Sequence, residues 1–232
     1  MKKITEIKKG KLTFKIKDNL TLDYGHKLRG FFANKFENVL FHNYEDNKNY
    51  RYGYPLIQYK ILRGKPTVIS LNEGVSLITK NFLEINKLTL AEKEYKKPTF
   101  DLQVYQEHLF VEDQAELLPY KYDFLTPWMG LNQDNHEKYK AEISTSSEQE
   151  QLDFLSSIII GNILSFAKEI DWWIEEKIKV IPVLKEINVH FKNNKMTGFK
   201  GFFFTNIFLP DYIGLGQSPA RGFGTIKGEK VH

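Results

Sequence analysis

The chain has 232 residues, of which 41% are hydrophobic and 14% are aromatic, so it is not a disordered chain and can form one large domain or two small ones. Its formal net charge of +4 is mildly basic, which is compatible with a polyanionic partner and does not demand one. It contains no cysteine, which excludes a disulfide framework and a thiolate metal site.

The first quarter of the chain predicts a strand and then a helix. Apolar and polar side chains alternate over residues 11–18, as is typical of a strand with one buried face. Over residues 24–40 the apolar side chains recur at helical spacing, which predicts an amphipathic helix. Gly30 lies inside this helix, where it costs about 1 kcal/mol relative to alanine, so we expect a close approach by another group at that position.

The next segments complete a recognisable order of elements. Residues 54–74 read as a hairpin whose turn is Arg63-Gly64-Lys65, residues 75–87 as a helix and residues 97–110 as a strand. The order strand, helix, two strands, helix, strand is that of a ferredoxin-like (RRM-like) unit. We therefore expect an N-terminal ferredoxin-like domain over residues 1–112.

The second half predicts a less regular copy of the same order. A strand at 121–131 is followed by a polar stretch at 132–151 and a helix at 152–178, which is preceded by serines and glutamates in the manner of a capping box. Two strands follow as a hairpin through Asn193-Asn194-Lys195, but no second helix is evident. The fold class expected is therefore α+β, with two tandem ferredoxin-like domains, of which the second, at 118–232, is irregular.

A glycine-rich segment, "GLGQSPARGFG" at residues 214–224, lies near the C-terminus. It lacks the Gly-Lys pair of a Walker loop, and too little chain follows it for a dinucleotide-binding unit. Two interpretations stay open: a clamp for a phosphate backbone, made by the main chain at Gly214, Gly216, Gly222 and Gly224, or a bulged start of the last strand.

Arginine is scarce in this lysine-rich chain. The four arginines are Arg29, Arg51, Arg63 and Arg221, and all but Arg51 directly precede a glycine. Because the guanidinium group binds a phosphate through two parallel hydrogen bonds, Arg29, Arg51 and Arg221 are candidate phosphate-binding residues. Arg63 has a simpler explanation as the flank of a hairpin turn.

Five segments in order along the chain carry a resemblance to a known family. The chain resembles the RNA-binding superfamily of CRISPR-associated proteins and, within it, the CRISPR repeat-RNA-processing endoribonucleases, the sixth Cas family. The segments are "LRGFFANKF" (28–36), "LFHNY" (40–44), "YRYGYPLIQYKILRGKPTVISLNEG" (50–74), "FLTPWMGLNQDN" (124–135) and "GLGQSPARGFG" (214–224). The resemblance implies metal-independent cleavage of a repeat transcript by 2′-hydroxyl attack, leaving a 2′,3′-cyclic phosphate and a 5′-hydroxyl.

Such chemistry needs a base, an acid and groups that stabilise the charged phosphorane, and histidine suits the first two roles. His42 stands where the family's variant of "LFHNY" carries a histidine, so the resemblance implies that it is the acid or base. His26 is a candidate partner, although a helix-start histidine is often only a cap or a surface residue. Tyr52 is a candidate hydrogen-bond donor to the histidine or the phosphate, and Lys60 a candidate cation for the phosphorane unless it is a solvated lysine.

The motifs of metal and serine hydrolases are absent: the sequence has no H-E-x-x-H, D-x-D or G-x-S-x-G. We therefore expect no metal ligands and no cofactor. The expected partner is CRISPR repeat RNA, with other Cas proteins and a second copy of the chain left open. Because neither a signal peptide nor an apolar membrane span is evident, the expected location is the cytoplasm.

Two rival functions stay open on sequence grounds. A non-catalytic relative that only binds guide RNA within an effector complex would share the fold and the glycine-rich segment. A ferredoxin-like domain with no RNA role would lack salt-dependent RNA affinity altogether.

Overall fold

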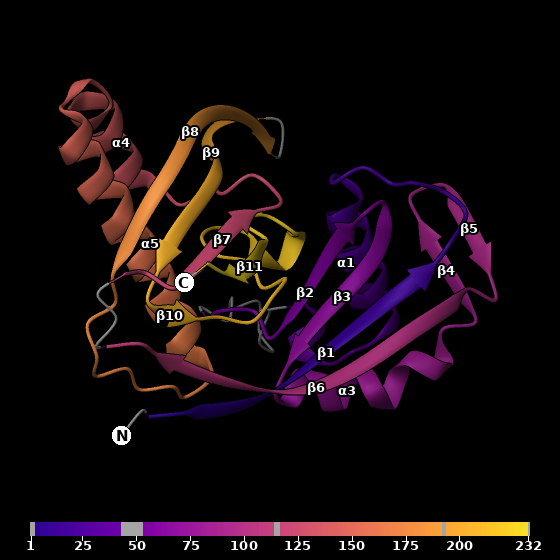
Figure 1. Cartoon of the computed structure of the whole chain (residues 1–232). Helices are drawn as coiled ribbons and strands as arrows, with labels where there is room; N and C mark the ends of the chain where they lie inside the picture. Colours follow the sequence, from indigo (N-terminus) through magenta and orange to yellow (C-terminus); the bar gives the residue numbers. More distant parts are fainter. Residues whose placement is uncertain (1–2, 43–52, 114–116, 192–193, 232) are drawn as a thin grey trace. The chain divides into compact units, whose positions relative to one another are not determined.

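The structure is a computed structural model that describes residues 3–42, 53–113, 117–191 and 194–231 (Figure 1). The chain divides into two compact units. The N-terminal unit comprises Glu6–His108 together with Pro219–Gly222. The C-terminal unit comprises Met1–Thr5, Leu109–Ser218 and Phe223–His232. This division differs from the expected bounds 1–112 and 118–232 mainly in the four residues of the glycine-rich segment that group with the N-terminal unit.

The N-terminal unit has a sheet in the strand order β6-β1-β3-β2. In chain order this is fourth, first, third, second, the arrangement that a β-α-β-β-α-β unit produces. β3 pairs antiparallel with both β1 and β2, and the β2–β3 turn places Arg63 and Gly64 at positive φ of 50° and 75°. The strands are β1 (Thr5–Lys15), β2 (Ile57–Leu62), β3 (Lys65–Leu71) and β6 (Thr99–Val111).

The helices of this unit are shorter than the sequence pattern predicted. The helix expected over 24–40 is α1 (Tyr24–Lys35), which ends where Phe36 becomes extended, followed by α2 (Val39–His42). The Asn38 side chain accepts a hydrogen bond from the Leu40 N–H, 2.9 Å, and so caps the new start. The second crossover is α3 (Glu73–Asn81) and η1 (Phe82–Glu84).

A small hairpin in this unit was not predicted. It consists of β4 (Lys87–Leu90) and β5 (Lys93–Lys96), paired antiparallel. Its turn carries no glycine or Asn-Gly pair. Ala91 instead adopts the positive φ, 55°, that glycine usually supplies. The usual sequence signal for a tight hairpin is therefore absent.

The C-terminal unit repeats the strand order. Its sheet is β11-β7-β9-β8, again fourth, first, third, second. The strands are β7 (Tyr120–Phe124), β8 (Val180–Phe191), β9 (Asn194–Thr205) and β11 (Ile226–Lys230). A short β10 (Ile207–Phe208) pairs with the end of β6 at Phe110 and Val111. The tandem ferredoxin-like fold predicted from the sequence is thus confirmed.

Between β9 and β11 the described chain forms no α-helix, only β10 and the single turn η3 (Pro219–Arg221). The first crossover is carried by α5 (Glu148–Glu169), whose Ser147 and Glu150 form the reciprocal hydrogen bonds of a capping box. The polar stretch before it, for which the sequence predicted no element, contains α4 (Gln133–Ala141) and η2 (Ile143–Thr145).

The α5 helix ends at Glu169, well before the predicted residue 178. Asp171 adopts φ of 55°, its N–H donates to the Lys168 carbonyl (3.3 Å) and the Trp172 N–H donates to the Ala167 carbonyl (2.8 Å). This is a Schellman ending, in which aspartate takes the left-handed position usually held by glycine. The apolar pattern continues past the end because Trp172 turns back into the core, where it is 4% exposed.

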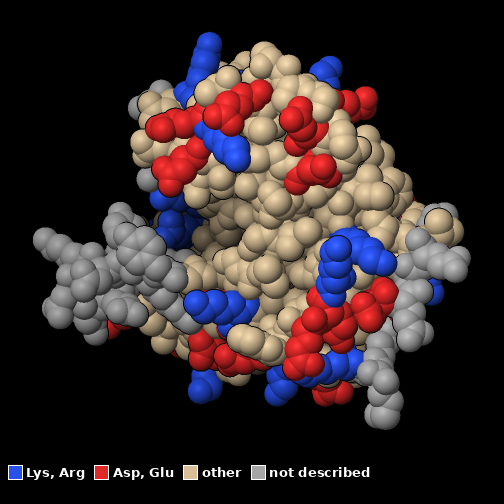
Figure 2. Space-filling model, turned by 90° about the vertical axis from the view of Figure 1, so that its left-hand side faces the viewer, with Lys and Arg blue, Asp and Glu red and all other residues tan. Residues whose placement is uncertain are grey.

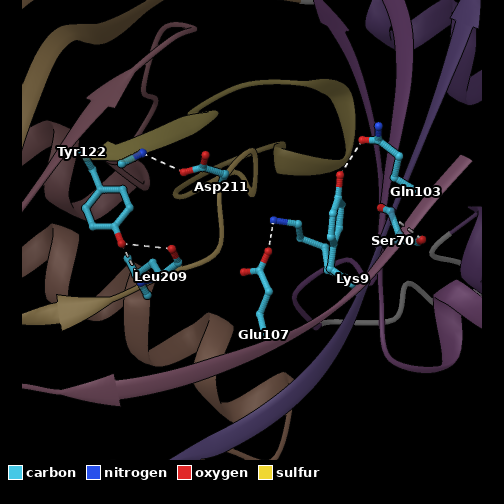
Figure 3. A network of polar contacts seen from close by, with 10 residues as sticks. Lys9, Ser70, Gln103, Glu107, Tyr122, Leu209 and Asp211 are labelled. Carbon is cyan, nitrogen blue, oxygen red and sulfur yellow. Dashed lines mark hydrogen bonds and ion pairs between the residues drawn. The ribbon is translucent and has the colours of Figure 1, made fainter. Parts of the chain in front are cut away.

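Each unit contains a buried polar side chain that is paired within that unit (Figure 3). In the N-terminal unit the ammonium group of Lys9 forms an ion pair with Glu107 across β1 and β6. In the C-terminal unit the Tyr122 hydroxyl donates to the Leu209 carbonyl (3.0 Å) and accepts from the Leu209 N–H (2.7 Å). These bonds hold the chain after β10 against β7.

Side chains of both charge signs are interspersed on the face drawn in Figure 2, around an area without charged groups. This face does not present a single-sign field of the kind that steers a polyanion. None of the described helices is long and apolar enough to cross a membrane.

Candidate active site

The end of α2 is anchored by an aromatic cluster. Phe41, the residue before His42, is 1% exposed, and its ring centroid lies 6.0 Å from that of Phe32 and 5.0 Å from that of Phe36. The Tyr59 hydroxyl donates a hydrogen bond of 3.4 Å to the Phe41 carbonyl. These contacts fix the backbone from which the candidate catalytic histidine projects.

Tyr59 also touches the glycine-rich segment. A Cβ on Gly222, which has φ of 93°, would lie 3.1 Å from the Tyr59 carbonyl oxygen. The backbone of Tyr59 therefore lies beside the tip of the segment (residues 219–222), whereas its hydroxyl group contacts α2. Burial raises the pKa of Tyr59, and the nearby Arg29 charge opposes that shift.

The tip of the segment also packs against the start of α1. A Cβ on Gly25 would lie 2.6 Å from the Arg221 carbonyl oxygen, which is closer than a real side chain permits. Glycine is therefore required at residue 25, directly before His26. His26 is exposed and Arg29, one turn further along α1, is partly exposed. The structure thus gathers His26, Arg29, Arg221 and Gly222 around the N-terminal half of α1.

The stems of the segment have a structural role in the C-terminal unit. Gly214 bridges Thr225, and a Cβ on Gly216 would lie 2.6 Å from the Met129 carbonyl oxygen. Gly224, at φ of 59°, donates its N–H to the Pro127 carbonyl (2.9 Å). The Gly222 N–H donates to the Pro219 carbonyl (3.1 Å).

These bonds change the interpretation of the glycines. The expectation that main-chain N–H groups converge on a phosphate does not hold for Gly222 and Gly224, because both N–H groups already donate within the chain. At these positions glycine provides left-handed turns and close backbone approach. Any phosphate contact from this segment is better supplied by the Arg221 side chain.

Lys60 does not match either sequence-based interpretation. Lys60 is 0% exposed, so it is neither a solvated lysine nor accessible to a phosphate group of bound RNA. Burial lowers the pKa of Lys60 to about 7. Its Cγ lies 4.0 Å from the position of a Cβ on Gly222, so the tip of the glycine-rich segment lies beside it.

Several candidate groups lie outside the described residues. Arg51 and Tyr52 are among these, and only the backbone of His42 is described. Conversely, sequence reasoning missed Tyr59 and Phe41 as the residues that position the site. Tyr59 lies within the hairpin predicted over residues 54–74, but its hydroxyl partner lies 18 positions away in the chain, where no local pattern indicates it.

In the part of the chain that the structure describes, no three histidine, aspartate or glutamate side chains gather as metal ligands would. The Arg29 guanidinium near Tyr59 suits phosphate oxygens rather than a metal ion. The site is therefore a cluster of histidine and arginine candidates at one helix.

Two family models together cover nearly the whole chain. The Cas6b N-terminal domain matches residues 5–108, and the Cas6b C-terminal domain matches residues 115–229. The chain belongs to the Cas6b family. The predicted relationship to the sixth Cas family is therefore confirmed.

Solved structures agree with this assignment. A Cas6b crystal structure is 35% identical, with a TM-score of 0.86 over 98% of this chain and 100% of that chain. A structure described as the CRISPR RNA processing endoribonuclease Cas6b is 33% identical, with a TM-score of 0.74 over 97% of this chain and 100% of that one. A Cas6-related protein from Pyrococcus furiosus, 11% identical with a TM-score of 0.53 over 98% and 100% of the two chains, shows the fold alone.

Among curated proteins, an uncharacterized protein of Methanocaldococcus jannaschii is 38% identical over 107 residues. The match covers 46% of this chain and 70% of the relative. The likeness to Cas6b proteins thus extends over both units, whereas this curated relative supports less than half of the chain.

Proposed function

We propose that this Cas6b protein is an endoribonuclease that cuts CRISPR repeat transcripts into guide RNAs without a metal ion. The observation that carries the proposal is the likeness of both units to a structure named for that activity, at 33% identity over nearly the full length. The cluster of histidine and arginine candidates on α1 and the glycine-rich segment is consistent with phosphodiester chemistry.

In the proposed reaction the ribose 2′-oxygen attacks the adjacent phosphorus, and the bond from phosphorus to the 5′-oxygen breaks. His42 acts as the general acid or base, and His26 is the proposed partner for the other proton transfer. One group takes the proton of the 2′-hydroxyl and the other gives a proton to the departing 5′-oxygen. The products are a 2′,3′-cyclic phosphate and a 5′-hydroxyl, and no water is consumed.

Charge on the phosphorane is proposed to be met by arginine side chains. The backbone of Arg221 lies beside Gly25, and the charge of Arg29 acts on Tyr59. Arg51 and Tyr52, which follow α2 in the sequence, are proposed to contribute as well. Lys60 is left out of this set because it has no exposed surface.

The test is cleavage of a labelled repeat RNA in EDTA by the wild type and His42→Ala, with a second RNA that carries one 2′-deoxy nucleotide at the cut site. We expect both changes to slow cleavage by about 100-fold or more, the usual scale for loss of acid–base catalysis. His108→Ala is the matched control, because His108 is exposed on β6 and pairs with Glu6 at 2.9 Å. It should cut at the wild-type rate.

Other outcomes would redirect the assignment. RNA that is bound but never cut would favour a guide-binding subunit. Normal cleavage by His42→Ala would leave the nuclease in place and move the search to His26. Wild-type protein without salt-dependent RNA affinity would contradict any RNA function.

The remaining partners are also proposals. Because the proposed substrate is a transcript, we place the reaction in the cytoplasm. A second copy of the chain and other Cas proteins are proposed as binding partners, and the mass of the protein with and without repeat RNA by light scattering would test the first of these.

A further inference from the structure

A groove lies between α1 and the β4–β5 hairpin of the N-terminal unit. Its volume is about 620 Å³, in the range of sites that hold small ligands. We call it the α1–β4 groove. Its lining consists of Lys27, Gly30, Phe31, Asn34, Lys35, Glu84, Asn86, Lys87, Thr89 and Ala91.

The helical part of the groove is one stripe of α1. Lys27, Gly30, Phe31 and Asn34 recur at the spacing of three and four residues that places side chains on a common helix face. The residues that pack inward, such as Leu28 and Phe32, lie on a different face. The groove is therefore a surface that the packing of α1 on the sheet leaves open.

The described residues give no reason for a glycine at position 30. A Cβ at this position would meet no atom within 4 Å, so the close approach expected from the sequence does not come from any described part of the protein. Alanine would be favoured in the middle of a helix, and no described residue lies close enough to oppose it. The missing side chain leaves the helix backbone bare at the floor of the groove, where a ligand could approach it.

The charges of the lining suit an anion. Three lysines and one glutamate line the groove. In the described part of the chain, Lys27 lies over the Tyr24 ring at 4.4 Å and Lys35 over the Phe36 ring at 5.6 Å, whereas Lys87 pairs with Glu94 at 2.6 Å. Two ammonium groups are thus held at the rim by aromatic rings rather than by carboxylates.

The other lining groups suit a nucleobase. Phe31 is partly exposed and offers a ring for stacking, while Asn34 and Asn86 carry both donors and acceptors for base edges. Lysines for phosphate, an aromatic ring and amide side chains are together the recognition chemistry of unpaired nucleotides.

We propose that the α1–β4 groove binds a short run of unpaired nucleotides of the repeat RNA, apart from the site of cleavage. The nucleotide backbone passes the bare helix at Gly30, and its phosphates contact Lys27 and Lys35, the two lining lysines that lie over aromatic rings. For its ligand the inference rests on the proposed RNA-processing function, but none of the residues that line the groove is among those proposed for the reaction.

Gly30→Gln tests the groove, because its side chain would fill the open floor. We expect it to weaken binding of the 2′-deoxy repeat RNA by about 10-fold or more, the scale of losing one good base contact. Gly30→Ala should raise the melting temperature by about 2–4 °C and still weaken binding, which separates lost recognition from lost folding.

Gly161 provides a matched control. It also lies inside a helix, α5, and a Cβ there would meet nothing within 4 Å, but it is not part of the α1–β4 groove. Gly161→Gln should bind RNA as the wild type does, and Gly161→Ala should show the same gain in melting temperature as Gly30→Ala.

Lys27→Ala/Lys35→Ala tests the phosphate contacts. Loss of two contacts to a single strand should reduce the slope of log affinity against log salt by about 1.4. Lys80→Ala/Lys168→Ala, which changes exposed lysines on α3 and α5, should leave that slope unchanged.

The outcomes keep this inference apart from the proposed function. If the wild type cuts repeat RNA and Gly30→Gln binds it as tightly as the wild type, the groove inference alone is overturned. If the wild type neither binds nor cuts RNA, both are overturned. A third outcome is that AMP or UMP binds the wild type but not Gly30→Gln, while both proteins bind RNA with the same affinity. The groove would then be a site for free nucleotides, and the RNA assignment would be wrong.

Discussion

The two units share a strand order but differ in how they make the second crossover. In the N-terminal unit the chain passes from β3 to β6 through α3, η1 and the small β4–β5 hairpin. In the C-terminal unit it passes from β9 to β11 through the glycine-rich segment and the single turn η3. The sheet is thus retained with or without a helix, and the crossover is the part that differs.

The crossover without a helix must obtain its backbone hydrogen bonds from other segments of the chain. A helix satisfies its own N–H and C=O groups, whereas an irregular segment must find partners elsewhere. In the glycine-rich segment the Gln217 and Gly224 N–H groups donate to the carbonyls of Met129 and Pro127, which follow β7. This close, strand-like approach is what makes glycine necessary, so the C-terminal unit should be more sensitive to change at its crossover.

Gly224→Ala should produce the largest effect. Its φ is 59°, and a Cβ would lie 1.9 Å from the Leu215 carbonyl oxygen, so the backbone itself must move. We expect a loss of about 3 kcal/mol or more in the free energy of unfolding. Urea unfolding followed by tryptophan fluorescence measures it in the relevant unit, because all three tryptophans belong to the C-terminal unit.

Gly161→Ala is the control for this measurement, since it changes the same unit without a clash and should stabilise it by about 1 kcal/mol. An unfolding midpoint in Gly224→Ala equal to that of the wild type would show that the crossover tolerates a side chain. The contrast between the two units would then be wrong.

Lys60→Met tests the N-terminal unit through pH. The folded pKa of Lys60 is about 7, below its ordinary value of 10.5, so the unfolded chain binds more protons between these pH values. Wild-type stability should therefore rise with pH across this interval and be reduced as pH falls toward 7. Lys60→Met should remove that slope and stabilise the protein at pH 8 by about 2 kcal/mol, as measured by urea unfolding followed by circular dichroism.

Lys80→Met, on the exposed side of α3, is the matched control and should keep the wild-type slope. A Lys60→Met protein that is less stable at every pH would mean that the ammonium group is paired well enough to offset its burial. That result would reopen a direct role for Lys60 in the site.

Ser147→Ala should produce the smallest effect. It removes the side chain that accepts from the Glu150 N–H, 3.3 Å, and with it the capping box of α5. We expect a loss of about 1 kcal/mol, again followed by tryptophan fluorescence. Ser157→Ala, within the same helix and exposed, should cost nothing; an equal loss in both variants would contradict the role of the cap.

Local signals predicted much of the fold. The alternation in β1, the Arg63-Gly64 turn and the capping box before α5 were all readable, because each depends on residues close together in the sequence. The failures have a common cause: Ala91 and Asp171 take left-handed conformations that usually indicate glycine, so a hairpin was missed and a helix was extended too far. The helix α4 was missed because only Tyr139 of its residues is buried.

The candidate site was less predictable than the fold. The sequence indicated the histidines and arginines by residue type, and these remain predictions. It could not indicate Tyr59, whose contacts join Phe41 to Gly222, because contacts between distant segments leave no periodic pattern. Nor could it separate an exposed lysine from a buried one at residue 60, since its alternating strand fits both.

The grouping of Pro219–Gly222 with Glu6–His108 has a consequence for recombination between relatives. A chimera joined anywhere between the two halves would combine the Gly25 and Tyr59 backbone of one parent with the Arg221 and Gly222 backbone of the other. Because Gly25 has no room for even a methyl group, a small change in the backbone of residues 219–222 would displace the start of α1. A chimera that is to remain functional should therefore take residues 219–222 from the same parent as its N-terminal half. These four residues form a second segment of that parent's sequence, separate from the first.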